Sequence, residues 1–119
     1  MKILLVHQNF PGQFLNLAPA LAARGHEVTA LTDEGNQRPS PVRTLRYKAP
    51  PKEITVSHPP GRVYAEMSAR GLSVARAARV MRDRHGYVPD LVFGHSGWGE
   101  TLFLKEVWPS ARLCIYAEL

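Results

Sequence analysis

The sequence has a single cysteine, Cys114, and it has no long uninterrupted run of apolar residues. One thiol cannot form an intramolecular disulfide, so cysteine usage favours a reducing compartment. A membrane-spanning helix needs about 18 or more consecutive apolar residues, and no segment approaches that length. The apolar block Met1–Val6 is too short for a secretory signal peptide. We therefore expect a cytoplasmic protein that at most lies peripherally on the inner membrane face.

Several catalytic and metal-binding patterns are also missing. The three spaced glycines of a dinucleotide fingerprint are absent, which argues against NAD-type chemistry. Ser96 follows an expected strand, but a nucleophile elbow needs glycine where Trp98 stands, and no Asp or His follows Ser96. The 5 histidines show no i,i+3 or i,i+4 pair and have no cysteine partners. We expect no serine hydrolase, no metal site and no cofactor.

What is present is the composition of an ordinary globular domain. The chain has 119 residues, of which 45% are hydrophobic and 21% are charged. These fractions exclude disordered and fibrous classes, and the length corresponds to one domain. The formal net charge of +5 permits anionic partners such as nucleic acid, phosphorylated small molecules or an acidic membrane surface.

Hydrophobic periodicity predicts strands that alternate with helices. The expected strands are residues 2–7, 26–32, 42–47, 90–94 and 112–116, and the expected helices are residues 13–24, 62–84 and 100–107. If Asn16 is the N-cap of the first helix, Pro19 falls in its first turn, where proline is tolerated. The proline-rich residues 49–61 are expected to be a connection. This alternation predicts an α/β fold of Rossmann-like, three-layer αβα type, with a five-stranded parallel sheet in the order 3-2-1-4-5.

Two glycine-bearing turns follow the first and fourth expected strands. Ligands of parallel sheets bind outside the carboxyl ends of the strands, so we expect these turns to lie side by side at a binding edge. Gly12 allows an anion to approach backbone N–H groups, although it also fits as a plain turn residue. His95 shares its turn with Trp98 and Glu100; imidazole donates to sugar hydroxyls and indole stacks on sugar faces. The competing interpretation is that His95 only hydrogen-bonds a neighbouring loop.

Arginines gather on the long helix expected at residues 62–84. Arg70, Arg76 and Arg79 lie mostly off its apolar stripe. One interpretation is a solvated helix face, and another is a surface for anions or an acidic membrane. No aromatic residues interleave with the arginines, so no nucleic-acid partner is expected through base stacking. A basic binding module for acidic membrane or nucleic acid, using the face from Arg70 to Arg84, stays open as an alternative, as does an unrelated enzyme with a small phosphorylated ligand at Gly12.

Three segments resemble the N-terminal domain of family 4 glycosyltransferases. They are MKILLVHQNFPGQF at residues 1–14, LAPALAARGHEV at residues 17–28 and PDLVFGHSGWGETLFL at residues 89–104. The first is similar to the subgroup with an HQNFPGQF opening. The resemblance implies the GT-B architecture, in which two Rossmann-like domains face each other across a cleft. It also implies a metal-independent, retaining transferase of hexosyl type that uses a nucleotide-sugar donor.

The same resemblance implies roles for individual residues. Gly12 is similar to the loop glycine near the donor phosphates and transferred sugar, and His95 is similar to the histidine that contacts this sugar. Gln13, Trp98 and Glu100 fall at the same edge with less defined roles. The donor is held mainly by a C-terminal domain in this family, while the N-terminal domain shapes the site for the acceptor, here an unidentified sugar or lipid.

The resemblance also predicts that this chain is one part of a larger enzyme. The donor-binding domain with its paired glutamates has no counterpart in residues 1–119. We therefore expect a single Rossmann-like domain that is a truncated acceptor-side half, inactive alone, with no catalytic residue assigned to it. If helices that cover the last strand are missing, apolar surface at Leu113, Ile115 and Tyr116 is uncovered, and such patches favour self-association.

Overall fold

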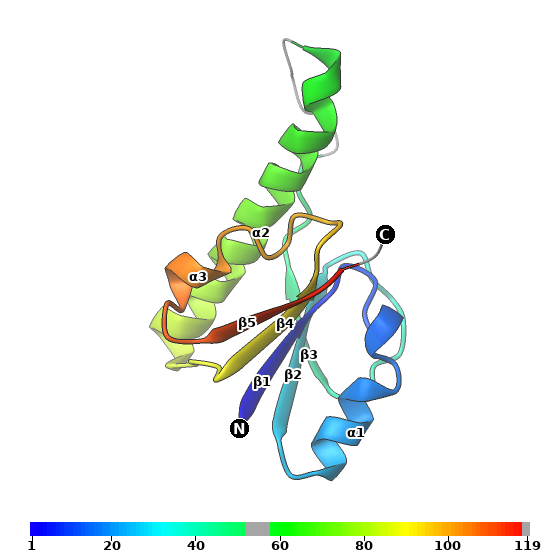
Figure 1. The fold of residues 1–119 in the computed structure, drawn as a ribbon, viewed down its shortest axis with the longest axis vertical. Helices are drawn as coiled ribbons and strands as arrows, with labels where there is room; N and C mark the ends of the chain where they lie inside the picture. The colour runs from blue at the N-terminus through cyan, green and yellow to red at the C-terminus, as the bar shows by residue number, and fades with distance from the viewer. Residues whose placement is uncertain (52–57, 118–119) are drawn as a thin grey trace.

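A five-stranded parallel sheet forms the centre of the computed structural model, which describes residues 1–51 and 58–117 (Figure 1). The strands are β1 (Lys2–Val6), β2 (Glu27–Asp33), β3 (Arg43–Tyr47), β4 (Leu91–His95) and β5 (Arg112–Tyr116). Their order in the sheet is β3-β2-β1-β4-β5, and every neighbouring pair is parallel. The predicted α/β class and strand order are confirmed.

Helices cover both faces of the sheet (Figure 1). The helix α1 (Leu17–Ala23) packs on one face, and α2 (Arg62–His85) and α3 (Leu104–Val107) pack on the other. Short 3-10 turns, η1 (Gly12–Phe14) and η2 (Pro59–Gly61), precede α1 and α2. The N-terminal half of α2 extends past the carboxyl ends of the strands.

Two predicted helices are shorter in the structure than in the sequence analysis. The expected helix at residues 13–24 is divided into η1 and α1; Asn16 holds the N-cap position without a side-chain capping bond, and Pro19 lies in the first turn as predicted. The expected helix at residues 100–107 is helical only in α3, because residues 100–103 form turns after Gly99, whose φ is 80°. Of the predicted connection at residues 49–61, residues 52–57 lie outside the described part of the chain.

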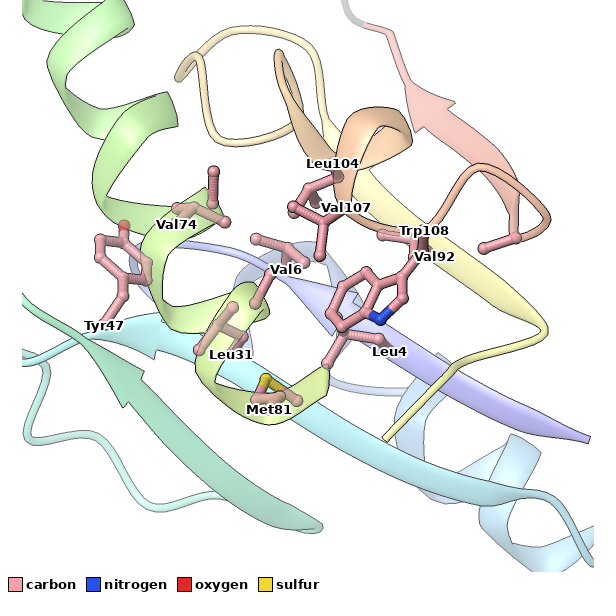
Figure 2. Close-up of a cluster of buried hydrophobic side chains, with 13 residues drawn as sticks. Leu4, Val6, Leu31, Tyr47, Val74, Met81, Val92, Leu104, Val107 and Trp108 are labelled. Carbon is pink, nitrogen blue, oxygen red and sulfur yellow. The ribbon is translucent and has the colours of Figure 1, made fainter. Parts of the chain in front are cut away.

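The central strand β1 is buried on both faces, which explains its continuous apolar run. Successive side chains of a strand point to opposite faces. Leu4 and Val6 therefore join the core under α2 and α3, while Ile3 and Leu5 join the core under α1. Figure 2 shows the first of these clusters, in which Leu4 and Val6 are surrounded by side chains from β2, β4, α2 and α3, and by Trp108.

Strand β5 is a largely exposed edge of the sheet. Ile115 and Tyr116 are 40% and 41% exposed, as expected for uncovered apolar surface. Leu113 instead packs partly against the core cluster under α2. Self-association of the chain through this edge stays a prediction. Within residues 1–51 and 58–117, none of the helices combines the length and apolar character needed to cross a bilayer.

The end of α2 gives a first testable prediction. Gly86 adopts the left-handed conformation with φ 61°, its N–H bonds to the carbonyl of Arg82, and the space around its Cα is open. Gly86→Ala is expected to lower the free energy of unfolding by about 1 kcal/mol, because alanine is strained at positive φ. Urea denaturation measures the change. Gly61→Ala is the control, since Gly61 also faces open space but has φ −79°; equal losses in both variants would contradict the backbone explanation.

Candidate functional site

Two histidines lie next to each other at the carboxyl edge of the sheet. His7 directly follows β1, and His95 is the last residue of β4. The strands are neighbours in parallel register, with Val6 opposite Gly94, so the residues that follow are brought together. The two rings make an edge-to-face contact with centroids 5.9 Å apart. The glycine-bearing turns therefore lie side by side, as the sequence predicts.

Both histidine rings are held by the same kind of hydrogen bond, which a backbone N–H two residues further along the chain donates to Nδ1. His7 Nδ1 accepts the N–H of Asn9 at 3.0 Å, and His95 Nδ1 accepts the N–H of Gly97 at 2.9 Å. A backbone N–H only donates, so Nδ1 carries no proton in either contact, and the proton of each neutral ring is on Nε2. In His7 this Nε2–H donates to Oε1 of Gln13. Each turn thus holds an imidazole in a defined orientation and tautomer.

Gly12 is the point of closest backbone approach to His7. Its φ is 43°, and a Cβ atom built at this position would lie 2.7 Å from Cε1 of the His7 ring. A side chain there meets both backbone strain and a collision with a buried ring. Gly12 and Gln13, both predicted site residues, are exposed beside His7, which joins them to His95. Sequence reasoning did not select His7 as a site residue.

An aromatic cluster surrounds His95. Trp98 stacks on the imidazole with centroids 5.5 Å apart, and Tyr116 lies at 5.8 Å. His95 is only 5% exposed, whereas Trp98 is 37% exposed. The accessible rings of the cluster are therefore the indole of Trp98 and the phenol of Tyr116, and the indole is an amphipathic ring suited to pack against the apolar face of a sugar.

Glu100 does not line the edge in the way that the sequence analysis expected. Its side chain is fully buried, because the turn after Gly99 directs it beneath the edge. Its Oε2 accepts a hydrogen bond from the hydroxyl of Tyr47 at 3.1 Å. Burial raises the pKa of Glu100 to about 7, although Tyr47, the N–H of Gln8 and Arg70 favour its charged form. Glu100 supports the edge from inside and presents no carboxylate to a ligand.

Arg70 belongs to the same buried network. Its Nη1 donates to the Tyr47 hydroxyl and to Oδ2 of Asp33, each at 3.1 Å. The sequence analysis grouped Arg70 with Arg76 and Arg79 as a surface, but only Arg76 and Arg79 are exposed. Arg70 is half-buried because its guanidinium turns toward Asp33 at the end of β2, and a role of the three arginines as an anion or membrane surface stays a prediction.

A hollow at the carboxyl edge lies between this network and Trp98. It has a volume of about 460 Å³ and is lined by residues that follow β1, end β2, connect β3 to α2, belong to α2 or follow β4, among them Gln8, Asp33, Arg70 and Trp98. A second hollow shares Gln8 and Asp33 with it. Neither is lined by Gly12 or His95. In the described residues, no three His, Cys, Asp or Glu side chains are close enough to hold a metal ion.

Comparison with known proteins assigns the family. A profile described as "Glycosyl transferase family 4 group" matches residues 24–119. The chain belongs to the glycosyltransferase family 4 group. The matched range contains His95, Trp98 and Glu100 but begins after the HQNFPGQF opening, so the subgroup rests on resemblance alone. No curated protein matches this family 4 chain.

Solved glycosyltransferases share the fold of the family 4 chain. SsfS6 from Streptomyces sp. SF2575, in complex with thymidine diphosphate, matches with a TM-score of 0.66 at 16% identity, over 98% of this chain and 38% of its own. The calicheamicin glycosyltransferase CalG4 matches with a TM-score of 0.62 at 18% identity, over 98% and 32%. SnogD from Streptomyces nogalater matches with a TM-score of 0.55 at 23% identity, over 84% and 29%. The chain thus spans well under half the length of these enzymes.

Proposed function

We propose that this family 4 chain is the N-terminal, acceptor-side domain of a two-domain glycosyltransferase. The complete enzyme would transfer a sugar of hexose type from a nucleotide-sugar donor to a sugar or lipid acceptor, with retention of anomeric configuration. The observation that carries the proposal is the contact between His7 and His95, which joins the Gly12 turn to the Trp98 turn at one edge of the sheet. The retaining chemistry and the two-domain organisation rest on family resemblance.

In the proposed mechanism the chain binds and orients the sugar. The indole of Trp98 packs against the sugar ring, and the buried ring of His95 holds the indole in place by stacking against it. Gly12, which has no side chain, lets the donor approach the backbone of the first turn. Arg70 and Gln8 line the neighbouring hollow, which is the proposed place of the acceptor.

The proposal includes inactivity of the chain alone. A leaving nucleoside diphosphate needs fixed positive charge and N–H donors around it. Arg70, which lines the Trp98 hollow, is engaged by Asp33 and Tyr47. Most of the stabilising charge must therefore come from a second domain, and we expect no sugar transfer by this chain from any nucleotide-sugar.

Binding to the chain tests the proposed site. Titration with TDP-glucose, UDP-glucose and GDP-mannose, followed by amide NMR, is expected to show weak binding, with a Kd of about 1 mM, and shifts around Gly12, His95 and Trp98. His95→Ala is expected to weaken this binding about fivefold, because Trp98 loses the ring against which it is stacked. His58→Ala is the matched control, because His58 is exposed and outside the site. Shifts elsewhere, or sugar transfer by the chain alone, would contradict the proposal.

A further inference from the structure

A groove on the α2 face of the sheet has about twice the volume of the hollow at the carboxyl edge. It measures about 930 Å³, against about 460 Å³ for the hollow that Trp98 lines. Its walls and floor come from β2, β3, the C-terminal half of α2 and the turn that follows α2. The groove extends along α2 from Ser73 to Gly86, a length of about 20 Å at 1.5 Å per residue.

The middle of the groove is apolar. Leu31 and Leu45 contribute from the sheet, and Ala77, Val80 and Met81 contribute from α2. Val80 is 43% exposed, and Leu45 and Ala77 are only partly buried, so this apolar surface is accessible from the groove. Each methylene buried there contributes about 0.8 kcal/mol to binding, which makes an extended alkyl chain a favourable occupant.

The rim of the groove is basic. The lysines and arginines that line it are Lys2, Arg43, Arg46, Lys48 and Arg76, against one carboxylate, Glu27. Arg46 donates to the carbonyl of Asn36. Arg43, Lys48 and Arg76 are exposed, and in the described part of the chain none of them forms an ion pair. This excess of positive charge complements an acidic headgroup.

We propose that the groove binds a single-chain amphiphile with an acidic headgroup. The alkyl chain lies along Leu45, Ala77 and Val80, and the headgroup meets the basic rim at Arg76. The occupant is a free amphiphile because a concave groove encloses one chain, whereas adsorption to a bilayer requires a protruding apolar face. Ala49 and Pro51 line both the groove and the hollow at the carboxyl edge, so a bound amphiphile lies beside the proposed acceptor site.

Dodecyl phosphate below its critical micelle concentration is the probe. Isothermal titration calorimetry of the chain is expected to show saturable binding of one molecule, and amide NMR is expected to place the largest shifts at Leu45, Ala77 and Val80. Inorganic phosphate, which lacks the chain, and dodecyl maltoside, which lacks the charge, are each expected to bind at least about tenfold more weakly. Binding of inorganic phosphate as strong as that of the amphiphile, or shifts confined to the carboxyl edge, would overturn the proposal.

Two arginines of α2 provide a matched pair of variants. Arg76 lines the groove, while Arg79, one turn further along and also exposed, does not. Arg76→Glu is expected to weaken binding of dodecyl phosphate about tenfold, and Arg79→Glu by less than about twofold. Both variants are expected to fold, because Arg76 and Arg79 are exposed. Circular dichroism checks this.

The same variants separate the groove from a membrane surface. The chain would be assigned to a bilayer surface, and the groove proposal overturned, by two results together. Free dodecyl phosphate would not bind, and co-sedimentation with phosphatidylglycerol vesicles would be weakened equally by Arg76→Glu and Arg79→Glu. Because the readout is binding and not sugar transfer, the amphiphile proposal and the transferase proposal can fail independently.

Discussion

Replacing Glu100 by glutamine is expected to stabilise the chain by about 2–3 kcal/mol at pH 8 and to remove most of its loss of stability between pH 5 and pH 8. Glu100 is fully buried, and burial raises its pKa from 4.5 to about 7. Between these two values the folded chain holds a proton that the unfolded chain has released. The contribution of Glu100 to the free energy of unfolding therefore falls as the pH rises from 4.5 to about 7 and is constant above that. The total fall corresponds to about 3 kcal/mol.

Glutamine has nearly the shape of glutamate, and its one side-chain oxygen can keep one of the two hydrogen bonds that the carboxylate accepts, from Tyr47 and from the N–H of Gln8. The Tyr47 hydroxyl donates to Oε2 of Glu100, and the amide oxygen of glutamine accepts the same bond. The amide is neutral, so it avoids the cost of burying a charge at pH 8. The pKa of about 7 already includes the attraction to Arg70, but the amide NH2 cannot accept the hydrogen bond from the N–H of Gln8, and the expected value is set below the full 3 kcal/mol for that reason.

Urea denaturation at pH 5, 6, 7 and 8 checks the prediction. All five histidines are retained in both proteins, so the difference between them isolates Glu100. Glu106→Gln is the control, because Glu106 is exposed on α3 and its replacement should leave the pH profile unchanged. If the free energy of unfolding of the wild type and of Glu100→Gln changed with pH in the same way, the raised pKa of Glu100 would be contradicted.

Gly12→Ala is expected to lower the free energy of unfolding by about 2–3 kcal/mol. Alanine at a φ of 43° costs about 1 kcal/mol, and overpacking against a ring costs at least about as much again. The ring cannot move away cheaply, because His7 is buried against Phe14 and His95 and bonded to Asn9 and Gln13. The variant should also disturb the His7–His95 contact.

Gly25→Ala separates the two contributions at Gly12. Gly25 also has a positive φ, 90°, but a Cβ atom there meets nothing within 4 Å. Its replacement should cost only the backbone part, about 1 kcal/mol. Urea denaturation gives both energies, and amide NMR reports whether the signals of Asn9 and Gly97 shift in Gly12→Ala alone. A cost at Gly12 no greater than that at Gly25 would contradict the tight approach to His7.

The strands and the edge they form were predictable because their signals are local. The run Ile3–Val6 is apolar without alternation, which requires burial on both faces and so a central position. Once the order 3-2-1-4-5 is adopted, the turns after β1 and β4 must meet. A further signal was available and was not used: His7, Asp33, Tyr47 and His95 stand at or directly after the ends of four strands, so their side chains gather at one edge.

The buried network was not predictable from spacing. Glu100 looks like the first residue of a helix, and its burial depends on Tyr47, which is 53 residues away in the sequence. Arg70 fits the arginine-rich face by helical periodicity, but the position of Asp33 at the end of β2 turns it inward. The groove under α2 forms because this long helix covers only part of the sheet face. Such features depend on tertiary placement, for which a single sequence carries no local signal.

The register between β1 and β4 sets the position of His95 relative to His7. A slip of one residue between these strands would displace His95 by about 3.3 Å along the sheet and turn its ring to the opposite face. The geometry of the proposed binding edge therefore depends on buried hydrophobic residues such as Leu4, Val6 and Val92, which hold the two strands in register from the interior of the domain.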